Sequence, residues 1–255
     1  INTLFKFILK NKKDVMNKIS VCIATYNGEK YIKEQLKSII PQLKKDDEII
    51  ISDDYSNDNT LKIIKSFRDH RIKIFTNPKK GLIFNFENAI LNSSGDYIFL
   101  SDQDDIWHKN KVKICLEDFK NNYDLVYSDC EIFDSETSKI IVSSFFEFYN
   151  CKKGVVNNIL KNTYMGCCMS FKANLKNKIL PFPKYLPMHD SWIGINAEIY
   201  FNVKHNTQKL IKHRRHENNA SETGSRKGSR SILTKFYWRV SLTYSLIVNF
   251  LKKKY

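Results

Sequence analysis

The chain alternates short apolar runs with segments whose apolar residues recur every three or four positions. Apolar runs rich in β-branched residues predict buried strands at 19–25, 48–52, 72–75 and 97–100. The segments 29–43 and 59–67, and a segment that begins at Gly81, have the spacing of helices. This alternation predicts an α/β fold, a single Rossmann-like and mainly parallel sheet with helices on both faces. Ligands bind such folds at the carboxyl ends of the strands.

The second half of the chain is less regular. Residues 124–128 are expected to continue the sheet, and 131–133 with 139–142 to form a hairpin. An apolar run at 164–171 predicts another buried strand, and the adjacent Cys167 and Cys168 within it are typical of packing. An apolar helix is expected at 192–199, and a strand near 210–213 leads into a basic loop.

The tail carries a separate signal. Apolar residues at spacings of three and four between 236 and 251 predict an amphipathic C-terminal helix. Residues 226–255 hold eight Lys or Arg and no acid, about half of the net charge of +15. Such a helix either lies on an anionic membrane surface or docks on its own domain, and the sequence leaves both alternatives open.

Composition and length indicate one large folded unit with two extensions. The 255 residues, 42% of them hydrophobic, suffice for a sizeable core. We expect a basic N-terminal extension at 1–18, a core domain at 19–220 divided into halves at 107/108, and a basic linker with the tail helix at 221–255. Six cysteines without a C-x-x-C pair indicate reduced thiols. No run spans a membrane and no signal peptide is evident, so we expect a cytoplasmic protein, either free or peripheral on the inner face of the cell membrane.

Candidate chemistry lies where two predicted strands end. Asp102, Asp104 and Asp105 follow the strand at 97–100, and Asp53 and Asp54 follow the strand at 48–52. Crowded carboxylates raise one another's pKa unless a cation lies among them, and Mg²⁺ or Mn²⁺ suits oxygen ligands. A solvated acidic turn, or a helix cap at Asp105, is the alternative. The absence of a Walker loop and of G-x-G-x-x-G means that metal and basic side chains must meet a ligand's phosphates.

Three ordered stretches, 21–28, 52–60 and 101–107, resemble the successive motifs of family 2 glycosyltransferases. The resemblance extends to about Asn219 and looks closest to the bacterial branch that includes rhamnosyltransferases and builds surface polysaccharides. It implies an A-type nucleotide-sugar-binding fold, a metal-bridged diphosphate and inversion at the anomeric carbon. It further implies a UDP- or dTDP-linked donor, and an acceptor hydroxyl on a growing glycan or lipid-linked saccharide. Residues 19–107 would then form the nucleotide-binding half and 108–220 the acceptor half.

Position by position, the resemblance implies two sets of binding residues. Asp54 would read the base, although Tyr55 stands where the family commonly has a small residue. The full nucleotide-binding set is Thr25, Tyr26, Asn27, Asp53, Asp54, Gly81, Asn85 and Asp102. The metal set is Asp104, Asp105 and His216, holding Mn²⁺ or Mg²⁺.

The resemblance also implies a catalytic residue in the second half. Asp190 matches the family's general base, whereas the residues alone leave a helix cap as the alternative. Candidate acceptor contacts are Trp107, Tyr164, His189 and Trp192. Aromatic core packing remains an open alternative for the three aromatic residues, and a structural role for the histidine.

Two other classes of protein account for part of the sequence. A metal-dependent nucleotidyltransferase or phosphohydrolase explains the acidic turns but neither Asp190 nor the three ordered motifs. A nucleic-acid-binding protein explains the charge of +15. Its positive residues should form a basic face with interleaved aromatics, but here they concentrate in the tail and at 204–215. We therefore expect no nucleic-acid partner.

Overall fold

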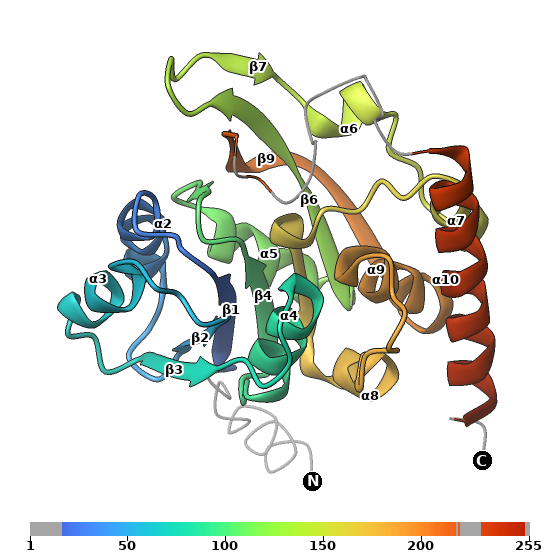
Figure 1. Cartoon of the computed structure of the whole chain (residues 1–255), viewed down its shortest axis with the longest axis horizontal. Helices are drawn as coiled ribbons and strands as arrows, with labels where there is room; N and C mark the ends of the chain where they lie inside the picture. Colours follow the sequence, from blue (N-terminus) through green and yellow to red (C-terminus); the bar gives the residue numbers. More distant parts are fainter. Residues whose placement is uncertain (1–16, 218, 220–230, 253–255) are drawn as a thin grey trace, which may run out of the picture.

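The fold is seen in a computed structural model that describes residues 17–217, 219 and 231–252 (Figure 1). The expected N-terminal extension and the expected linker therefore lie almost wholly outside the described residues. No helix in the described ranges is long and apolar enough to cross a membrane.

A mixed sheet forms the centre of the molecule. Among the described residues it has nine strands in the order β3-β2-β1-β4-β8-β6-β9-β5, with β7 paired to β6. In chain order these are β1 (Ile19–Thr25), β2 (Glu48–Asp53), β3 (Ile72–Thr76), β4 (Tyr97–Ser101), β5 (Ile106–Trp107), β6 (Leu125–Asp134), β7 (Ile140–Val142), β8 (Met169–Lys172) and β9 (Val203–Arg215).

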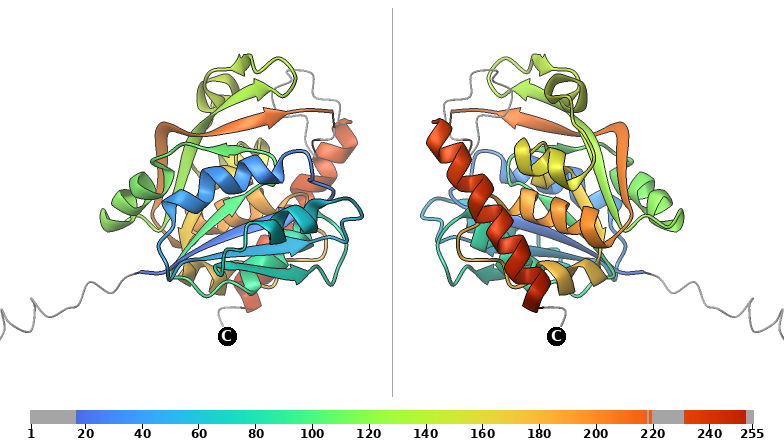
Figure 2. Two further views of the ribbon diagram at one scale, coloured as in Figure 1. Left: turned by 90° about the vertical axis from the view of Figure 1, so that its left-hand side faces the viewer. Right: turned by 90° about the vertical axis from the view of Figure 1, so that its right-hand side faces the viewer.

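Helices cover both faces of the sheet, as expected (Figures 1 and 2). They are α2 (Ile32–Ile39), α3 (Thr60–Ser66), α4 (Leu82–Leu91), α5 (Lys111–Lys120), α6 (Phe145–Tyr149), α7 (Val155–Leu160), α8 (Lys176–Ile179), α9 (His189–Tyr200) and α10 (Ile232–Lys252). The first predicted helix is shorter than expected. It passes at Ile40 into a 3-10 turn, because Pro41 has no backbone N–H for a further α-helical hydrogen bond.

The first half confirms the predicted parallel arrangement. β1 pairs in parallel with both β2 and β4, and β2 with β3. Every residue of β1, β2 and β4 is buried, which is why these strands read as continuous apolar runs. Thr25 lies opposite Asp53 in the register, so the two strand ends meet at one edge.

The second half differs from the prediction in three places. Residues 125–134 form one long strand, β6, and the expected hairpin with β7 extends from its end. At 164–171 only β8, from Met169 onward, is a strand, because Gly166–Cys168 turns as a 3-10 segment. An added Cβ at Gly166 would lie 2.4 Å from Nε2 of His189, so this turn packs directly on α9. β8 runs antiparallel between β4 and β6, whereas β6 and β9 pair in parallel.

A buried carboxylate joins strands at the edge opposite the strand ends. Glu48 is 1% exposed and accepts hydrogen bonds from Lys73 Nζ at 2.7 Å, Lys18 Nζ at 2.9 Å and Ser20 Oγ at 2.6 Å. Burial alone would raise the pKa of Glu48, but these hydrogen bonds hold its pKa far below its usual range. The carboxylate therefore stabilises the folded state as an anion.

We predict that Glu48→Gln lowers the free energy of unfolding at pH 7 by about 1–3 kcal/mol, because charge-assisted hydrogen bonds are lost in a buried site. A depressed folded-state pKa means that this stabilisation is present above the unfolded carboxyl pKa of about 4.3 and is lost as the pH falls below it. Urea unfolding at pH 7 and pH 3 should show the difference from wild type shrinking at pH 3. Asp46→Asn, at an exposed position, is the control. A difference independent of pH would contradict the prediction.

Candidate active site

The carboxyl ends of β1, β2 and β4 form one rim of the sheet. Oγ1 of Thr25 donates a 2.8 Å hydrogen bond to Oδ1 of Asp53. Asp53 is 3% exposed, and it also accepts from the backbone N–H and the hydroxyl of Ser56, at 2.8 and 2.6 Å. Asp53 therefore braces the turn after β2 from inside the protein.

Asp54, the next residue, is partly exposed and organises the start of α4. Its Oδ1 accepts from Asn77 Nδ2 and its Oδ2 from the backbone N–H of Gly81, each at 2.9 Å. Gly81 has a φ of 111°, a conformation that side chains disfavour. One turn later, Asn85 Nδ2 donates to the carbonyl of Thr25 at 3.0 Å. Oδ1 of Asn85 is buried without a hydrogen-bond partner among the described residues. The structure thus brings the predicted residues of β1, β2 and α4 together.

The loop after β1 is tied to the acidic turn after β4. The Gln103 side chain accepts from the backbone N–H of Tyr26 at 3.0 Å and donates to its carbonyl at 2.9 Å. The Tyr26 ring is 56% exposed, and the Asn27 side chain accepts from the backbone N–H of Asn57 at 2.9 Å. Gln103 is absent from the predicted set. Gly28 is the sequence feature that accompanies this contact, because an added Cβ there would lie 2.2 Å from Gln103 Oε1.

Asp104 and His216, which are 112 positions apart, meet at the rim. His216 Nε2 lies 2.8 Å from Asp104 Oδ2, and the imidazole stacks on Tyr31 with 4.7 Å between ring centroids. The side chains are 11% and 10% exposed. A carboxylate and an imidazole held this close together are suitable ligands for Mn²⁺, and the carboxylate for Mg²⁺.

Arg214 fixes the backbone of the acidic turn and is a second residue that sequence reasoning missed. Its Nε donates to the carbonyl of Asp104 at 2.8 Å. Its guanidinium carbon lies 4.9 Å from the ring centroid of Tyr31 and 4.7 Å from that of Phe133. Its backbone N–H donates to Asp105 Oδ1 at 3.0 Å. In the sequence it is one of several basic residues, with nothing to distinguish it.

Asp105 points into the protein beside His213. Its Oδ1 lies 2.9 Å from His213 Nδ1, and the carboxylate is fully buried. Burial alone would lower the pKa of His213, but the Asp105 carboxylate raises it to about 9. Helix α5 begins only at Lys111, so Asp105 does not cap it, contrary to the open alternative.

Asp105 and His213 also belong to a second group of possible metal ligands. Potential ligand atoms of Asp102, Asp105, Cys167 and His213 all lie within 4.8 Å of one another. Asp105 Oδ2 is buried without a hydrogen-bond partner in the described ranges. Burial, together with the charges of Asp105 and Asp104, raises the pKa of Asp102 well above its usual range. A divalent cation at this turn would satisfy the free oxygen and relieve the repulsion.

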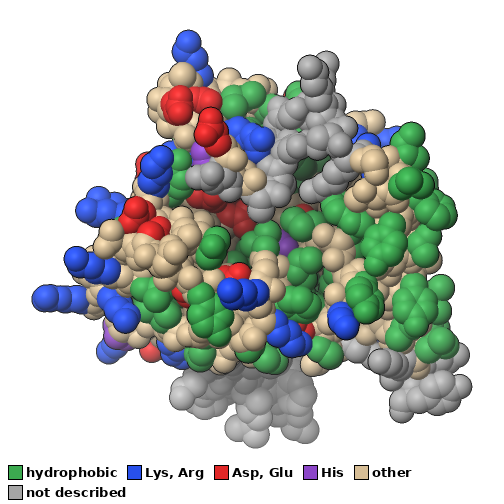
Figure 3. Space-filling model, viewed as in Figure 1, with side chains coloured by type: hydrophobic (Ala, Val, Ile, Leu, Met, Phe, Trp, Pro, Cys, Tyr) green, Lys and Arg blue, Asp and Glu red, His purple; other side chains and the backbone are tan. Residues whose placement is uncertain are grey.

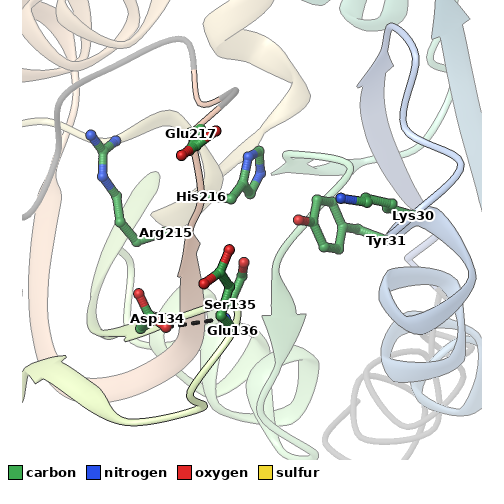
Figure 4. A pocket seen from close by; sticks show the side chains of 8 residues that line it. All are labelled: Lys30, Tyr31, Asp134, Ser135, Glu136, Arg215, His216 and Glu217. Atoms are coloured by element: carbon green, nitrogen blue, oxygen red, sulfur yellow. Dashed lines mark hydrogen bonds between the residues drawn. The ribbon is translucent and has the colours of Figure 1, made fainter.

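A pocket of about 610 Å³ opens beside His216 (Figure 4). It lies between the start of α2, the turn after β6 and the end of β9. Its lining residues are Lys30, Tyr31, Asp134, Ser135, Glu136, Arg215, His216 and Glu217. The pocket therefore gives a ligand access to the histidine side of the Asp104–His216 pair.

Asp190 lies in the first turn of α9. Its Oδ1 accepts from Asn162 Nδ2 at 3.1 Å and from the backbone N–H of Ser191 at 2.5 Å. Met188 is the N-cap residue, so Asp190 is not the cap that the sequence left as an alternative. The carboxylate is 8% exposed and is oriented by an amide from a different segment. The two hydrogen bonds fix the orientation of the carboxylate.

The four predicted acceptor contacts are all buried. Trp192 is fully buried and its Nε1 donates to the carbonyl of Ile179, while the Tyr164 hydroxyl donates to Glu198. Trp107 is 3% exposed beneath Lys111. His189 stacks on Phe86 at 4.1 Å between centroids, and burial lowers its pKa to about 3, so it is neutral. Burial favours the core-packing alternative for all four, because none has a ring face open to a sugar.

The fold and the acidic rim define an A-type glycosyltransferase architecture, which solved structures share. Residues across 92% of the chain superpose on 66% of the chain of S. aureus TarS 1-349 in complex with UDP-GlcNAc, with a TM-score of 0.68 and 20% identity. The mannosyltransferase PcManGT from Pyrobaculum calidifontis, in complex with GDP-Man and Mn²⁺, covers 97% of this chain and 69% of its own, with a TM-score of 0.57 and 17% identity.

The chain belongs to the family "Glycosyl transferase family 2", whose profile matches residues 20–179, more than half of the sequence. The profile ends before Asp190 and His216, short of the expected extent to about Asn219. A relative is the E. coli UDP-Glc:alpha-D-GlcNAc-diphosphoundecaprenol beta-1,3-glucosyltransferase WfgD, 33% identical over 58% of this chain and 57% of its own length. The Shigella flexneri dTDP-rhamnosyl transferase RfbG is 47% identical over 37% of this chain and 36% of its own. The resemblance to family 2 is thereby confirmed, and the chain matches only about half or less of these relatives' lengths.

We predict that Gly28→Ala displaces the Gln103 side chain and loses its two hydrogen bonds to Tyr26. The free energy of unfolding should fall by about 1–2 kcal/mol, and Gln103→Ala should cost a similar amount. Because both changes remove the same contacts, the double variant should be no less stable than the worse single variant. Urea unfolding of the four proteins measures this coupling. Additive losses would show that Gly28 and Gln103 act independently.

Proposed function

We propose that the protein is an inverting, metal-dependent glycosyltransferase that moves a sugar from a nucleoside-diphosphate sugar to a hydroxyl of a growing glycan or lipid-linked saccharide. The observation that carries this proposal is the meeting of Asp104 with His216 at the rim that also holds Asp54. Membership of family 2 supports it.

The donor nucleotide would bind across the ends of β1, β2 and β4. Asp54 is held by Asn77 and Gly81 so that its remaining acceptor capacity can receive hydrogen bonds from a base. The exposed Tyr26 ring offers a stacking surface, and the partnerless Oδ1 of Asn85 offers an acceptor. Thr25, Asn27 and Asp53 would shape this site, and Asp102 would contact the ribose. The names of the relatives favour a UDP- or dTDP-linked sugar.

Asp104 and His216 would hold Mn²⁺ or Mg²⁺. Asp105, which sequence reasoning also assigned to the metal, faces His213 and belongs with Asp102 and Cys167 instead. Such an ion, when bound, stabilises the negative charge that develops on the leaving nucleoside diphosphate. Arg214 keeps the Asp104 backbone in place, so the carboxylate is presented without reorganisation.

Asp190 would act as the general base. The acceptor oxygen forms a bond to the anomeric carbon as the bond from that carbon to the diphosphate oxygen breaks, and Asp190 takes the hydroxyl proton. Asn162 orients the carboxylate from a neighbouring segment. A base positioned in this way contributes about 10²- to 10⁴-fold to the rate.

The acceptor and location follow from the relatives. WfgD is named for an undecaprenol-diphosphate-linked sugar, and a Campylobacter jejuni relative, 33% identical over 46% of this chain, is also named for an undecaprenol-linked substrate. We infer that this chain uses a lipid-linked or polymeric saccharide and works peripherally on the cytoplasmic face of the membrane. A phosphohydrolase would share the acidic rim but would release nucleotide without an acceptor, and a nucleotidyltransferase would transfer the nucleotide itself to its acceptor.

The donor site is tested by calorimetry with UDP, dTDP and GDP, each with and without Mn²⁺. We expect metal-dependent binding of UDP or dTDP, weakened about 10- to 100-fold in Asp104→Asn, because loss of a ligand or its partner reduces metal affinity by that order. Asp46→Asn, an exposed acid remote from the rim, should bind like wild type. Nucleotide binding that is equally strong without Mn²⁺ and in Asp104→Asn would refute the assignment of this site.

The base is tested with Asp190→Asn, which preserves the size of the side chain. Transfer should fall at least about 10²-fold, while nucleotide affinity stays within about twofold of wild type. Asn162→Ala should lower the transfer rate less, because it only loosens the carboxylate. Rates are measured as acceptor-dependent nucleotide release. Transfer at the wild-type rate in Asp190→Asn would remove Asp190 from this role.

A further inference from the structure

Helix α10 docks on the domain through small and polar side chains. Ser241, Leu242 and Ser245 are 9%, 3% and 7% exposed. Asn249 Nδ2 donates to the carbonyl of Lys178 at 2.9 Å and to Asn196 Oδ1 at 3.1 Å. The hydroxyl of Ser241 also donates to the carbonyl of Tyr185. The docking contacts thus combine hydrogen bonds with the apolar packing of Leu242 and Leu246 against the core.

The opposite face of α10 is apolar and points to solvent. At least half of each side chain is exposed in Phe236 (64%), Tyr237 (59%), Val240 (50%), Tyr244 (67%), Ile247 (54%), Phe250 (50%) and Leu251 (53%). A surface helix of a soluble domain ordinarily buries its apolar face and exposes its polar one. Here that arrangement is reversed. Figure 3 shows hydrophobic side chains gathered where α10 lies, and Figure 2 shows the helix crossing the outside of the molecule.

Neighbouring segments extend this apolar surface. On α7, Val156 and Leu160 are 69% and 56% exposed, and Arg239 of α10 joins the two helices by donating from Nη2 to the carbonyl of Leu160 at 2.7 Å. Tyr185, whose carbonyl accepts the hydrogen bond from the Ser241 hydroxyl, is 61% exposed. We call the seven α10 residues named above, together with Val156, Leu160 and Tyr185, the outer stripe.

The charge around the outer stripe identifies its partner. Lys235 and Arg239 are exposed on α10, and Lys184 lies 5.2 Å from the ring centroid of Tyr185. No Asp or Glu occurs in α7, in α10 or between residues 180 and 188. Aromatic and aliphatic side chains flanked only by cations match the boundary between acyl chains and anionic headgroups. A protein partner would need an apolar groove with acidic residues around it. An anionic bilayer offers apolar acyl chains and negatively charged headgroups over its whole surface.

We propose that the outer stripe is a membrane-docking surface, on which α10 lies in the plane of an anionic bilayer. The helix does not span it, consistent with the lack of a spanning segment among the described residues. Tyr185 precedes Asp190 by five positions, so the docked surface and the candidate base belong to one segment. Docking would hold the acceptor half against the membrane that carries a lipid-linked saccharide. This last consequence rests on the proposed function, but binding itself does not.

Vesicle flotation of the full chain tests the inference. We expect binding to vesicles of phosphatidylcholine with about 30 mol% phosphatidylglycerol, weaker binding to phosphatidylcholine alone, and weakening as salt is raised. Phe236→Ser/Ile247→Ser should reduce the partition coefficient by about tenfold or more, because two large apolar side chains leave the interface. Lys235→Glu should reduce binding only to the anionic vesicles.

The matched control is Leu91→Ser/Ile140→Ser, which changes two exposed apolar residues, 63% and 57% exposed, outside the outer stripe. It should bind vesicles like wild type. Equal binding by the stripe variant and the control would overturn the inference. The chain could instead fail to bind vesicles and show the mass of a dimer in light scattering. If the stripe variant were then a monomer, the outer stripe would be an interface with a second copy, and the inference would be overturned. Nucleotide affinity, measured on the same preparations, tests the proposed donor site separately. Vesicle binding without nucleotide binding would contradict the proposed function and leave the membrane-docking inference intact.

Discussion

Negative charge at the end of β4 cannot persist without positive charge nearby, and the end of β9 supplies it. Arg214 binds the backbone of the acidic turn, His213 pairs with the buried Asp105, and His216 faces Asp104. These contacts join segments more than 100 positions apart in the sequence. The positions of Asp104 and Asp105 therefore depend on this closure between the two halves of the sheet.

The mixed topology serves this closure. β1 to β4 form a parallel layer that brings Thr25, Asp54 and the acidic turn to one edge. The reversed strand β8 then lets the sheet continue into β6 and β9, which run parallel to β4. Their carboxyl ends arrive at the same edge, so cations and carboxylates meet there. A nucleotide bound at β1 and β2 would lie beside a cation site shared by both halves.

Much of this arrangement could be predicted from local patterns. Strand runs such as 19–25 and 97–100 are buried on both faces, so hydrophobicity alone marks them. The order of Thr25, Asp54 and Asp104 at strand ends follows from the parallel alternation. The candidate acceptor residues are all buried: Trp107, Tyr164, His189 and Trp192. The sequence could not predict this, because an aromatic residue has the same sequence pattern whether its ring faces the core or a ligand.

Local sequence patterns predict most of the elements, the family and the spacing of the acids, since these depend on contacts within a few residues. Which basic residue meets which acid depends on pairing between distant strands, because Arg214 and Arg215 differ in strand register and not in chemistry. Tertiary contacts also decide the direction in which α10 faces. The periodicity of its apolar residues predicts a helix with two faces, whereas the hydrogen bonds of Ser241 and Asn249 to the domain turn the apolar face outward.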